Sequence, residues 1–257
     1  MFDLELEGKV AIITGGSDGL GLASARRMAM EGAKVVICAR RENHLERASQ
    51  TLTAETGGTI RGIRADVSKP EDCLNLIDKT NEIFGGVDIL VNNAGTSAAS
   101  PFENVSDEDW KEDLELKVMG AIRMCRGVLP IMRERGGGVI VNATISGGKA
   151  PQAQALPTTL SRAAGINLTK SLANEYAQDN IRVNAICIGL LKSAQWERRA
   201  AGTSLDELYT NLAKKVPLGR VGEAEEYADL VAFLCSARSA YITGTAINLD
   251  GGICPVV

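Results

Sequence analysis

A glycine-rich segment near the start of the chain has the composition and spacing of a phosphate-binding loop. It reads TGGSDGLG over residues 14–21, and Gly15, Gly19 and Gly21 fit the spacing T-G-x-x-x-G-x-G. Such glycines permit a tight turn and let backbone N–H groups approach a pyrophosphate, while the N-terminus of the following helix favours negative charge. We therefore expect the loop to bind a dinucleotide. The alternative is a tight turn between a strand and a helix that holds no ligand.

The residues after the second predicted strand bear on which dinucleotide is bound. An acidic residue there would hydrogen-bond a ribose 2′-hydroxyl and suit NAD, but the chain has Ala39 followed by Arg40 and Arg41. A guanidinium matches the geometry of a 2′-phosphate. This favours NADP over NAD, although the carboxylate of Asp18 would oppose a phosphate close to the adenosine ribose. The alternative is that both arginines only form the solvated start of a helix.

Alternating strands and helices must position these residues. The predicted strands cover residues 9–14, 34–39, 59–67, 87–95, 137–144, 181–189 and 244–250. The predicted helices cover residues 20–32, 41–55, 70–85, a long segment capped by Ser106, 158–178 and 223–236. Strands that are apolar on both faces and separated by helices indicate a parallel sheet covered on both sides. We predict one α/β domain over residues 1–257.

Composition and charge exclude several classes of protein. The chain has 257 residues, a net charge of −4 and no basic excess that would indicate nucleic-acid binding. No segment approaches the roughly 18 apolar residues of a membrane span, and the acidic start MFDLELEGKV is no signal peptide. We expect a cytoplasmic protein that binds neither nucleic acid nor membrane. The six scattered cysteines fit no zinc site and no disulfide framework, so we predict free thiols and no metal.

Five motifs together resemble the short-chain dehydrogenase/reductase family over nearly the whole chain. They are TGGSDGLG (14–21), ADV (65–67), NNAG (92–95), IRVN (181–184) and YITGTAINLDGG (241–252). The resemblance implies a single Rossmann-type, doubly wound domain with a central parallel sheet of about seven strands, flanked by helices on both faces. It also implies a nicotinamide cofactor and a homo-oligomer, a tetramer or a dimer, built on two long helices.

The resemblance further implies which residues line the cofactor. Asp66 would contact the adenine amino group with Val67 beside it, and the NNAG turn would line the cofactor and brace the central strands. The segment from Ile188 to Ser193 would lie over the nicotinamide, and an insert at about 190–217 would form a substrate lid. The expected cofactor-binding residues are Gly15, Ser17, Asp18, Gly19, Leu20, Gly21, Arg40, Arg41, Asp66, Val67, Asn93, Ala94, Gly95, Arg162, Ile188, Gly189 and Leu191.

All four catalytic positions of the family differ in this chain. The family uses an asparagine, a serine, a tyrosine that transfers the proton and a lysine that lowers the pKa of the tyrosine. An ungapped alignment places at these positions Lys117, Ile145 (flanked by Thr144 and Ser146), Thr158 and Arg162. The roles of the usual residues therefore do not transfer to this chain.

The replacement residues differ in what they can do with a proton. The hydroxyl of Thr158 can hydrogen-bond a carbonyl but is a poor general acid, and Arg162 stays protonated, so it would clamp a ribose or a carboxylate. Lys117 is the titratable candidate, because apolar walls and Arg162 should lower its pKa, provided that its helix bulges toward the pocket. Alternatively, both cations pair with acidic neighbours such as Asp113 or Glu115, or the site has lost its chemistry.

Several functions are consistent with these residues. We favour an NADP(H)-dependent oxidoreductase that reduces a carbonyl or oxidises an alcohol of a small substrate through a non-standard proton relay. An electropositive pocket would suit an anionic substrate, with Trp196, Arg198 and Arg199 of the lid contributing, unless QWERR (195–199) is an exposed helix with its tryptophan turned inward. The alternatives are a nucleotide-binding sensor, scaffold or partner subunit without dehydrogenase activity, and a lyase, isomerase or hydratase that has reused the pocket.

Overall fold

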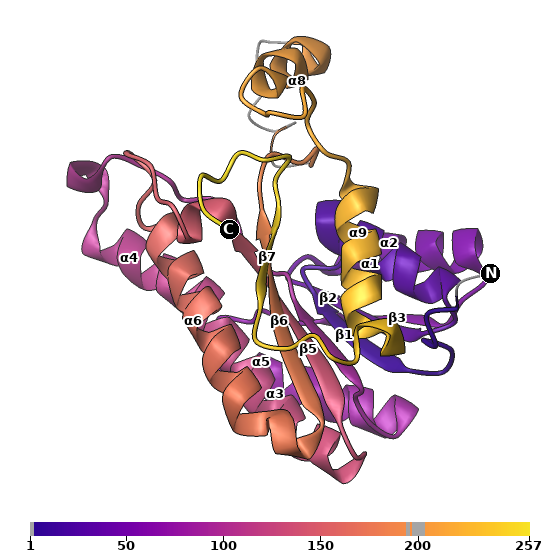
Figure 1. Ribbon diagram of the computed structural model, residues 1–257. Coiled ribbons are helices and arrows are strands. Elements are labelled where there is room, and N and C mark those ends of the chain that lie inside the picture. Colours follow the sequence, from indigo (N-terminus) through magenta and orange to yellow (C-terminus); the bar gives the residue numbers. More distant parts are fainter. Residues whose placement is uncertain (1–2, 194–195, 197–203) are drawn as a thin grey trace.

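A seven-stranded parallel sheet forms the centre of the computed structural model, which describes residues 3–193, 196 and 204–257 (Figure 1). The strands are β1 (Val10–Thr14), β2 (Lys34–Ala39), β3 (Ile60–Arg64), β4 (Ile89–Asn92), β5 (Gly138–Ile145), β6 (Ile181–Ile188) and β7 (Ala246–Leu249). Their order across the sheet is β3-β2-β1-β4-β5-β6-β7, and every neighbouring pair is parallel. The direction of winding reverses between β1 and β4, and ligands of such sheets bind at the carboxyl ends of the strands at this point.

Helices cover both faces of the sheet. They are α1 (Gly19–Met30), α2 (Glu42–Thr56), α3 (Pro70–Phe84), α4 (Asp107–Leu114), α5 (Gly120–Glu134), α6 (Thr158–Tyr176), α8 (Leu205–Ala213) and α9 (Ala224–Cys235). Helices α1, α2 and α9 pack on one face, and α3, α5 and α6 on the other, while α8 lies apart from both layers (Figure 1). The predicted parallel sheet covered on both sides is confirmed.

Alternating side chains along the central strands divide the core into two layers. In β1, Ala11 and Ile13 belong to the layer beneath α1, α2 and α9, whereas Ile12 belongs to the layer beneath α3 and α5. All three side chains are fully buried. Because burial of one aliphatic side chain contributes about 1.5–3 kcal/mol, strands that are apolar on both faces stabilise both layers at once.

The long helical segment after Ser106 is interrupted by a wider turn. Ser106 caps α4 as predicted, and its hydroxyl accepts from the Asp109 N–H at 3.1 Å in a capping box. After α4 the chain forms a π-helical turn, Glu115–Met119, before it continues as α5. Such a turn inserts one extra residue into the helix and often lies at a functional site. Here it holds Lys117.

The described residues contain neither a candidate metal site nor a candidate membrane span. Within this part of the chain, no helix is both long enough and apolar enough to cross a bilayer. Nor do three or more His, Cys, Asp and Glu side chains of these residues gather closely enough to hold a metal ion. The six cysteines are free thiols, five of them buried.

Candidate active site

The glycine-rich loop lies between the end of β1 and the start of α1. Gly15 and Gly19 have φ angles of 66° and 51°, in the left-handed region that favours glycine. A Cβ on Gly21 would overlap the carbonyl oxygen of Gly15, whereas a Cβ on Gly19 would have only Ser193 Cβ nearby, at 3.9 Å. The loop is therefore packed tightly on its inner side and open on its outer side. That cradle at a helix N-terminus fits a pyrophosphate.

Other residues of the loop have structural roles that the spacing of the motif does not show. Asp18 caps α1, because its carboxylate accepts from the Gly19 N–H at 2.8 Å. A Cβ on Gly16 would lie 2.6 Å from Ile37 Cγ2, so this position also requires glycine. Ser17 and Leu20 are half-buried beside them. The loop is thus held both by its cap and by β2.

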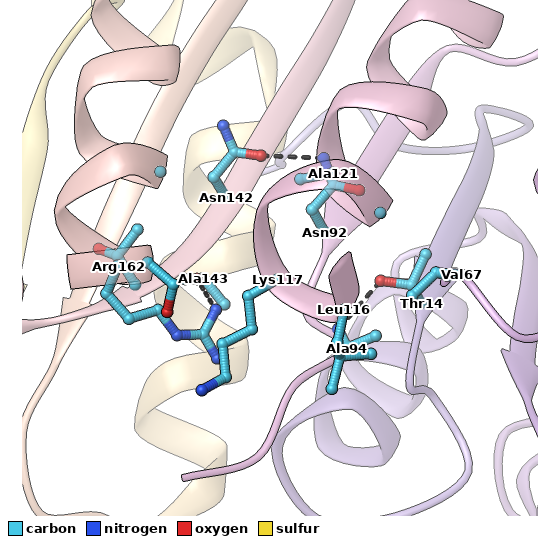
Figure 2. A pocket seen from close by; sticks show the side chains of 14 residues that line it. Thr14, Val67, Asn92, Ala94, Leu116, Lys117, Ala121, Asn142, Ala143 and Arg162 are labelled. Atoms are coloured by element: carbon cyan, nitrogen blue, oxygen red, sulfur yellow. Dashed lines mark hydrogen bonds between the residues drawn. The ribbon is translucent and has the colours of Figure 1, made fainter. Parts of the chain in front are cut away.

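The NNAG turn after β4 is hydrogen-bonded directly to the glycine-rich loop. Thr14 Oγ1 accepts from the backbone N–H groups of Asn93 and Ala94, each at 3.0 Å, and Figure 2 shows the bond from Ala94. The Asn93 amide donates to the carbonyl oxygens of Thr14 at 3.0 Å and Gly15 at 3.3 Å. The two motifs, almost 80 residues apart in the chain, therefore form one rigid wall of the cleft.

The residues expected at the adenosine end lie after β2 and β3. Arg40 and Arg41 are exposed, and among the described residues neither guanidinium forms an ion pair. Asp66 Oδ1 accepts from the Ser68 hydroxyl at 2.7 Å, while Val67 is buried in the core. The two exposed cations and the carboxylate oriented by Ser68 therefore follow the carboxyl ends of β2 and β3, and their contacts with adenine and a 2′-phosphate stay a prediction.

The segment after β6 corrects part of the expectation for the nicotinamide side. Leu191 is only 5% exposed and packs in the hydrophobic core, so its side chain does not face a cofactor. A Cβ on Gly189 would overlap Asp250 Cβ, so the backbone there is closely packed as well. Ile188 is half-buried. Any contact of Gly189 or Leu191 with a nicotinamide would therefore come from the backbone.

Only part of the predicted lid belongs to the described residues. Trp196 is half-buried, and its backbone N–H donates to the Ser193 carbonyl at 2.9 Å, whereas Arg198 and Arg199 lie outside the described residues. Lys192, at the start of this segment, pairs with Glu223 at 2.6 Å. Its Nζ also lies 5.7 Å from the centre of the Tyr209 ring in α8. The base of the insert is therefore anchored to α8 and to the start of α9.

Lys117 points from the π-helical turn into a buried polar cluster, beside Arg162 (Figure 2). Its side chain is only 1% exposed, and its Nζ forms an ion pair with Asp113 Oδ1. The same nitrogen donates to Thr158 Oγ1 at 3.1 Å. The turn thus supplies the inward bulge that the prediction for Lys117 required. Lys117 therefore pairs with Asp113 and also lines the pocket.

The Thr158 hydroxyl has both of its acceptor positions occupied. Besides the bond from Lys117 Nζ, Thr158 Oγ1 accepts from the Ala98 N–H at 2.9 Å. A hydroxyl has two lone pairs and one proton. Since the lone pairs are engaged by donors, the proton is the part of the hydroxyl that remains for a further partner. Thr158 is therefore arranged to donate.

Arg162 connects the NNAG turn to the end of β5. Its Nη1 donates to the Ala143 carbonyl at 2.7 Å (Figure 2). A Cβ on Gly95 would overlap Nη2, so the guanidinium occupies the space that glycine leaves free. Its Nε is buried and has no partner among the described residues. The side chain is held in place but retains an unused donor.

Burial dominates the electrostatics of this cluster. It lowers the pKa of Lys117 to about 8, an effect that the hydrogen bond donated by Lys117 to Asp113 opposes and the nearby Arg162 charge increases. Burial also lowers the pKa of Arg162 from its ordinary value. The fall in the Lys117 pKa agrees in direction and cause with the prediction. With two cations and one carboxylate, the cluster carries a net positive charge.

Thr144 and Ser146, which flank the family's serine position, lie in different environments. Thr144 is 1% exposed, and its hydroxyl donates to the Ile186 carbonyl at 3.0 Å and contacts Cys187 Sγ at 3.3 Å. The Thr144 hydroxyl is therefore engaged with β6, while the residue also lines the cavity beside Lys117 and Arg162, and its catalytic role stays a prediction. Ser146 is half-buried at the start of the turn after β5.

Two buried asparagines stabilise the site and were not identified from the sequence. The Asn92 amide donates to Asn142 Oδ1 at 2.9 Å (Figure 2), and the Asn142 amide donates to Thr169 Oγ1 at 2.9 Å. This chain of hydrogen bonds joins β4, β5 and α6. Both asparagines, with Lys117 and Arg162, line a cavity of about 20 Å³, which is large enough for one water molecule. In the sequence, the signal for these two residues is one asparagine in each of two strands that otherwise consist mainly of apolar residues.

The geometry agrees with what comparisons with known proteins find. A family model described as enoyl-(acyl carrier protein) reductase matches residues 15–254. The chain belongs to the short-chain dehydrogenase/reductase family. It is 39% identical over 255 residues to dehydrogenase/reductase SDR family member 4 of Oryctolagus cuniculus, an alignment that covers 96% of this chain and 94% of that protein.

Solved structures of this family have the same fold. L-sorbose reductase from Gluconobacter frateurii, complexed with NADPH and L-sorbose, is 36% identical, with a TM-score of 0.96 and complete coverage of both chains. An NADPH-bound short chain oxidoreductase from Pseudomonas aeruginosa PAO1 that contains an atypical catalytic center is 35% identical, with a TM-score of 0.92 over 97% of this chain and 98% of that one. The predicted Rossmann-type fold is confirmed.

Proposed function

We propose that this protein is an NADP(H)-dependent oxidoreductase that interconverts a carbonyl and an alcohol of a small substrate through a relay of Thr158 and Lys117. One observation carries the proposal. The Thr158 hydroxyl accepts hydrogen bonds from the buried Lys117 ammonium and from the Ala98 backbone N–H, so its own proton remains available for donation. In this proposal, Thr158 takes the place that the family gives to a tyrosine, and its two hydrogen-bond donors activate its hydroxyl.

The chain's own residues suit NADP(H), which when bound supplies or accepts the hydride. The backbone of the loop from Gly15 to Gly21 would hold the pyrophosphate. Arg40 and Arg41 would bind the 2′-phosphate, since both guanidiniums are exposed at the end of β2. Asp66 and Val67 would lie at the adenine, and Asn93, Ala94, Gly95 and Ile188 along the nicotinamide half. The similar structures that bind NADPH support this choice, and NAD is the alternative.

The relay moves one proton across two hydrogen bonds. In carbonyl reduction, Thr158 donates its hydroxyl proton to the substrate oxygen as negative charge develops there, and takes a proton from the Lys117 ammonium in the same step. An unassisted threonine is too weak an acid for this, because its alkoxide is unstable near neutral pH. Lys117 is left neutral and regains its proton from solvent, and alcohol oxidation runs the same steps in reverse.

Two further residues orient the reactants. Arg162 would hold a ribose hydroxyl or a substrate carboxylate with the donors that its bond to Ala143 leaves free. Ser146 would hydrogen-bond the substrate oxygen, while Thr144 supports this wall from within the sheet. The net positive charge of the cluster favours a small anionic substrate.

The remaining features are proposals about organisation. We propose one domain over residues 1–257, with the insert at about 190–217 as a substrate lid over the carboxyl ends of the strands. We propose a dimer or tetramer built on α5 and α6, whose outer surfaces form a groove lined by Leu129, Leu168, Leu172 and Tyr176. The six free thiols support a cytoplasmic, reducing compartment.

A titration followed by a turnover assay tests the proposal. The purified protein is titrated with NADPH and NADH, and then offered small carbonyl compounds, carboxylate-bearing ones first, while NADPH oxidation is followed. Tight NADPH binding with turnover is the expected result. Binding without turnover of any carbonyl would instead favour the second candidate, a nucleotide-binding sensor or scaffold, for which the change at all four catalytic positions argues. Failure to bind either nucleotide would overturn the cofactor assignment.

A further inference from the structure

The carboxylate of Asp113 is buried in a way that stability alone does not explain. Its side chain, on the last turns of α4, is 2% exposed, and that of its partner Lys117 is 1% exposed. Only Oδ1 takes part in the ion pair, while Oδ2 is buried and has no partner among the described residues. Burying an ion pair costs several kcal/mol of desolvation per ion, so an apolar pair of similar volume is often as stable. The pair is therefore a candidate for a role in the chemistry.

We propose that Asp113 is the positioning residue of the proton relay, whose carboxylate holds the Lys117 ammonium against the Thr158 hydroxyl and keeps it charged. This inference rests on the proposed function, in which Lys117 supplies the proton. The geometry is direct: one hydrogen of the Lys117 ammonium points to Asp113 from four residues away, and another to Thr158 at 3.1 Å. Two fixed partners leave a lysine side chain with little freedom to turn away.

The charges around Lys117 show why a carboxylate is needed there. From α6, Arg162 faces Lys117 and disfavours its positive charge, and burial acts in the same direction. Glu115, on the same π-helical turn, pairs with Arg123 instead and is 42% exposed. Among the described residues, Asp113 is thus the carboxylate that compensates Lys117. Without it, the pKa of Lys117 would fall below about 8, and the lysine would be neutral when the relay needs its proton.

Direct titration of Lys117 tests this without relying on activity. The full chain is labelled at lysine Nζ and Cε, the Lys117 signal is identified by its loss in Lys117→Arg, and its pKa is read by NMR. In Asp113→Asn, which keeps a hydrogen-bond acceptor but removes the charge, we expect the Lys117 pKa to be at least about one pH unit lower than in the wild type. The matched control Glu115→Gln, on the same turn, should leave it unchanged. A Lys117 that titrates at the same pH in Asp113→Asn would overturn the proposal.

The pH dependence of turnover gives a second readout. Carbonyl reduction needs protonated Lys117, so kcat/KM should fall as the pH rises through about 8, and in Asp113→Asn this fall should begin at least about one pH unit lower. The KM for NADPH should not change. If the wild type reduces no carbonyl, the proposed function fails, while the NMR titration still decides what Asp113 does to Lys117.

A longer carboxylate covers the case in which Asp113→Asn does not fold. Asp113→Glu keeps the charge but displaces it by one methylene group, so the ammonium should stay protonated and lose its alignment with Thr158. We expect kcat to fall about tenfold or more with an unchanged KM for NADPH, because small misplacements of a reacting group are costly. Wild-type kcat in Asp113→Glu would contradict the positioning role.

Discussion

The cofactor cradle and the Lys117 pocket lie next to each other, but the cradle is formed mainly by the backbone and the pocket by side chains. The cradle consists of backbone N–H groups, glycines without space for a Cβ, and the hydrogen bonds from Asn93 to Thr14 and Gly15. The pocket consists of side chains from α4, the π-helical turn and α6 that meet in the interior. The cradle has the glycine spacing that resembles the family's pattern, whereas the pocket holds Lys117, Thr158 and Arg162, which the ungapped alignment places at catalytic positions of the family.

This difference indicates which parts of the fold tolerate the substitution of residues. A backbone site depends on close packing, so a single added carbon disturbs it. A side-chain site depends on hydrogen-bond connectivity, which other residue types can rebuild. Here Lys117 pairs with Asp113 and donates to Thr158 at 3.1 Å. Thr158 also accepts from Ala98 at 2.9 Å, and Arg162 donates to Ala143 at 2.7 Å.

Removing Lys117 should separate the two regions most sharply. We expect Lys117→Ala to lower kcat for carbonyl reduction by about 100- to 10,000-fold, the range for loss of general acid catalysis, with unchanged NADPH affinity. The variant should also lose roughly 3–5 kcal/mol of unfolding free energy, because Asp113 is left buried and unpaired. The double variant Lys117→Ala/Asp113→Asn should regain stability but not activity. Full activity in Lys117→Ala would exclude the lysine from the relay.

Adding a side chain to the cradle should have the next largest effect. A Cβ at Gly21 overlaps the Gly15 carbonyl, so we expect Gly21→Ala to weaken NADPH binding about tenfold or more in a calorimetric titration. Gly57→Ala is the control, because Gly57 lies at a helix end with open space around it, where its positive φ makes a side chain costly to stability alone. It should lower stability without changing affinity. Equal losses of affinity in both variants would argue against a cradle built on close packing.

The choice of dinucleotide should depend on one exposed cation. We expect Arg40→Ala to weaken NADPH binding about tenfold and to leave NADH binding unchanged, since a hydrogen bond to a charged phosphate contributes about 1.5–3 kcal/mol. Arg47→Ala, an exposed arginine on α2, is the matched control. Should NADPH and NADH affinities fall together, or neither change, the guanidinium of Arg40 does not read the 2′-phosphate.

A methyl group at the junction of the two regions should have the smallest effect. In Gly95→Ala the new Cβ displaces the flexible end of Arg162, and we expect kcat/KM to fall about three- to tenfold, as for modest overpacking. If Gly95→Ala acts by displacing the Arg162 guanidinium, then adding Gly95→Ala to Arg162→Lys should cause little further loss of kcat/KM. Strictly additive losses in this double-mutant cycle would show that Gly95 acts independently of Arg162.

The fold was predictable because its signals are local. The run VAII in β1, apolar on both faces, and the glycines that end α2 and α3 reflect the doubly covered sheet, and Ser106 could be recognised as a cap from its own neighbours. The π-helical turn could not be foreseen in this way, because an extra residue in a helix is stabilised by what its side chain reaches. Lys117 reaches Thr158, 41 residues further along the chain.

By itself, the sequence determined the order of strands and helices, the glycine loop and the types of residue available for proton transfer. These follow from local periodicity and from the absence of a Cβ at a few positions. Only the tertiary structure decided that Lys117, Thr158 and Asp113 form one hydrogen-bonded cluster, while the Thr144 hydroxyl donates to β6 and Leu191 packs in the core. The physical reason is that burial and pairing of charges depend on all the elements that surround a side chain, and the pKa of Lys117 is set by that environment.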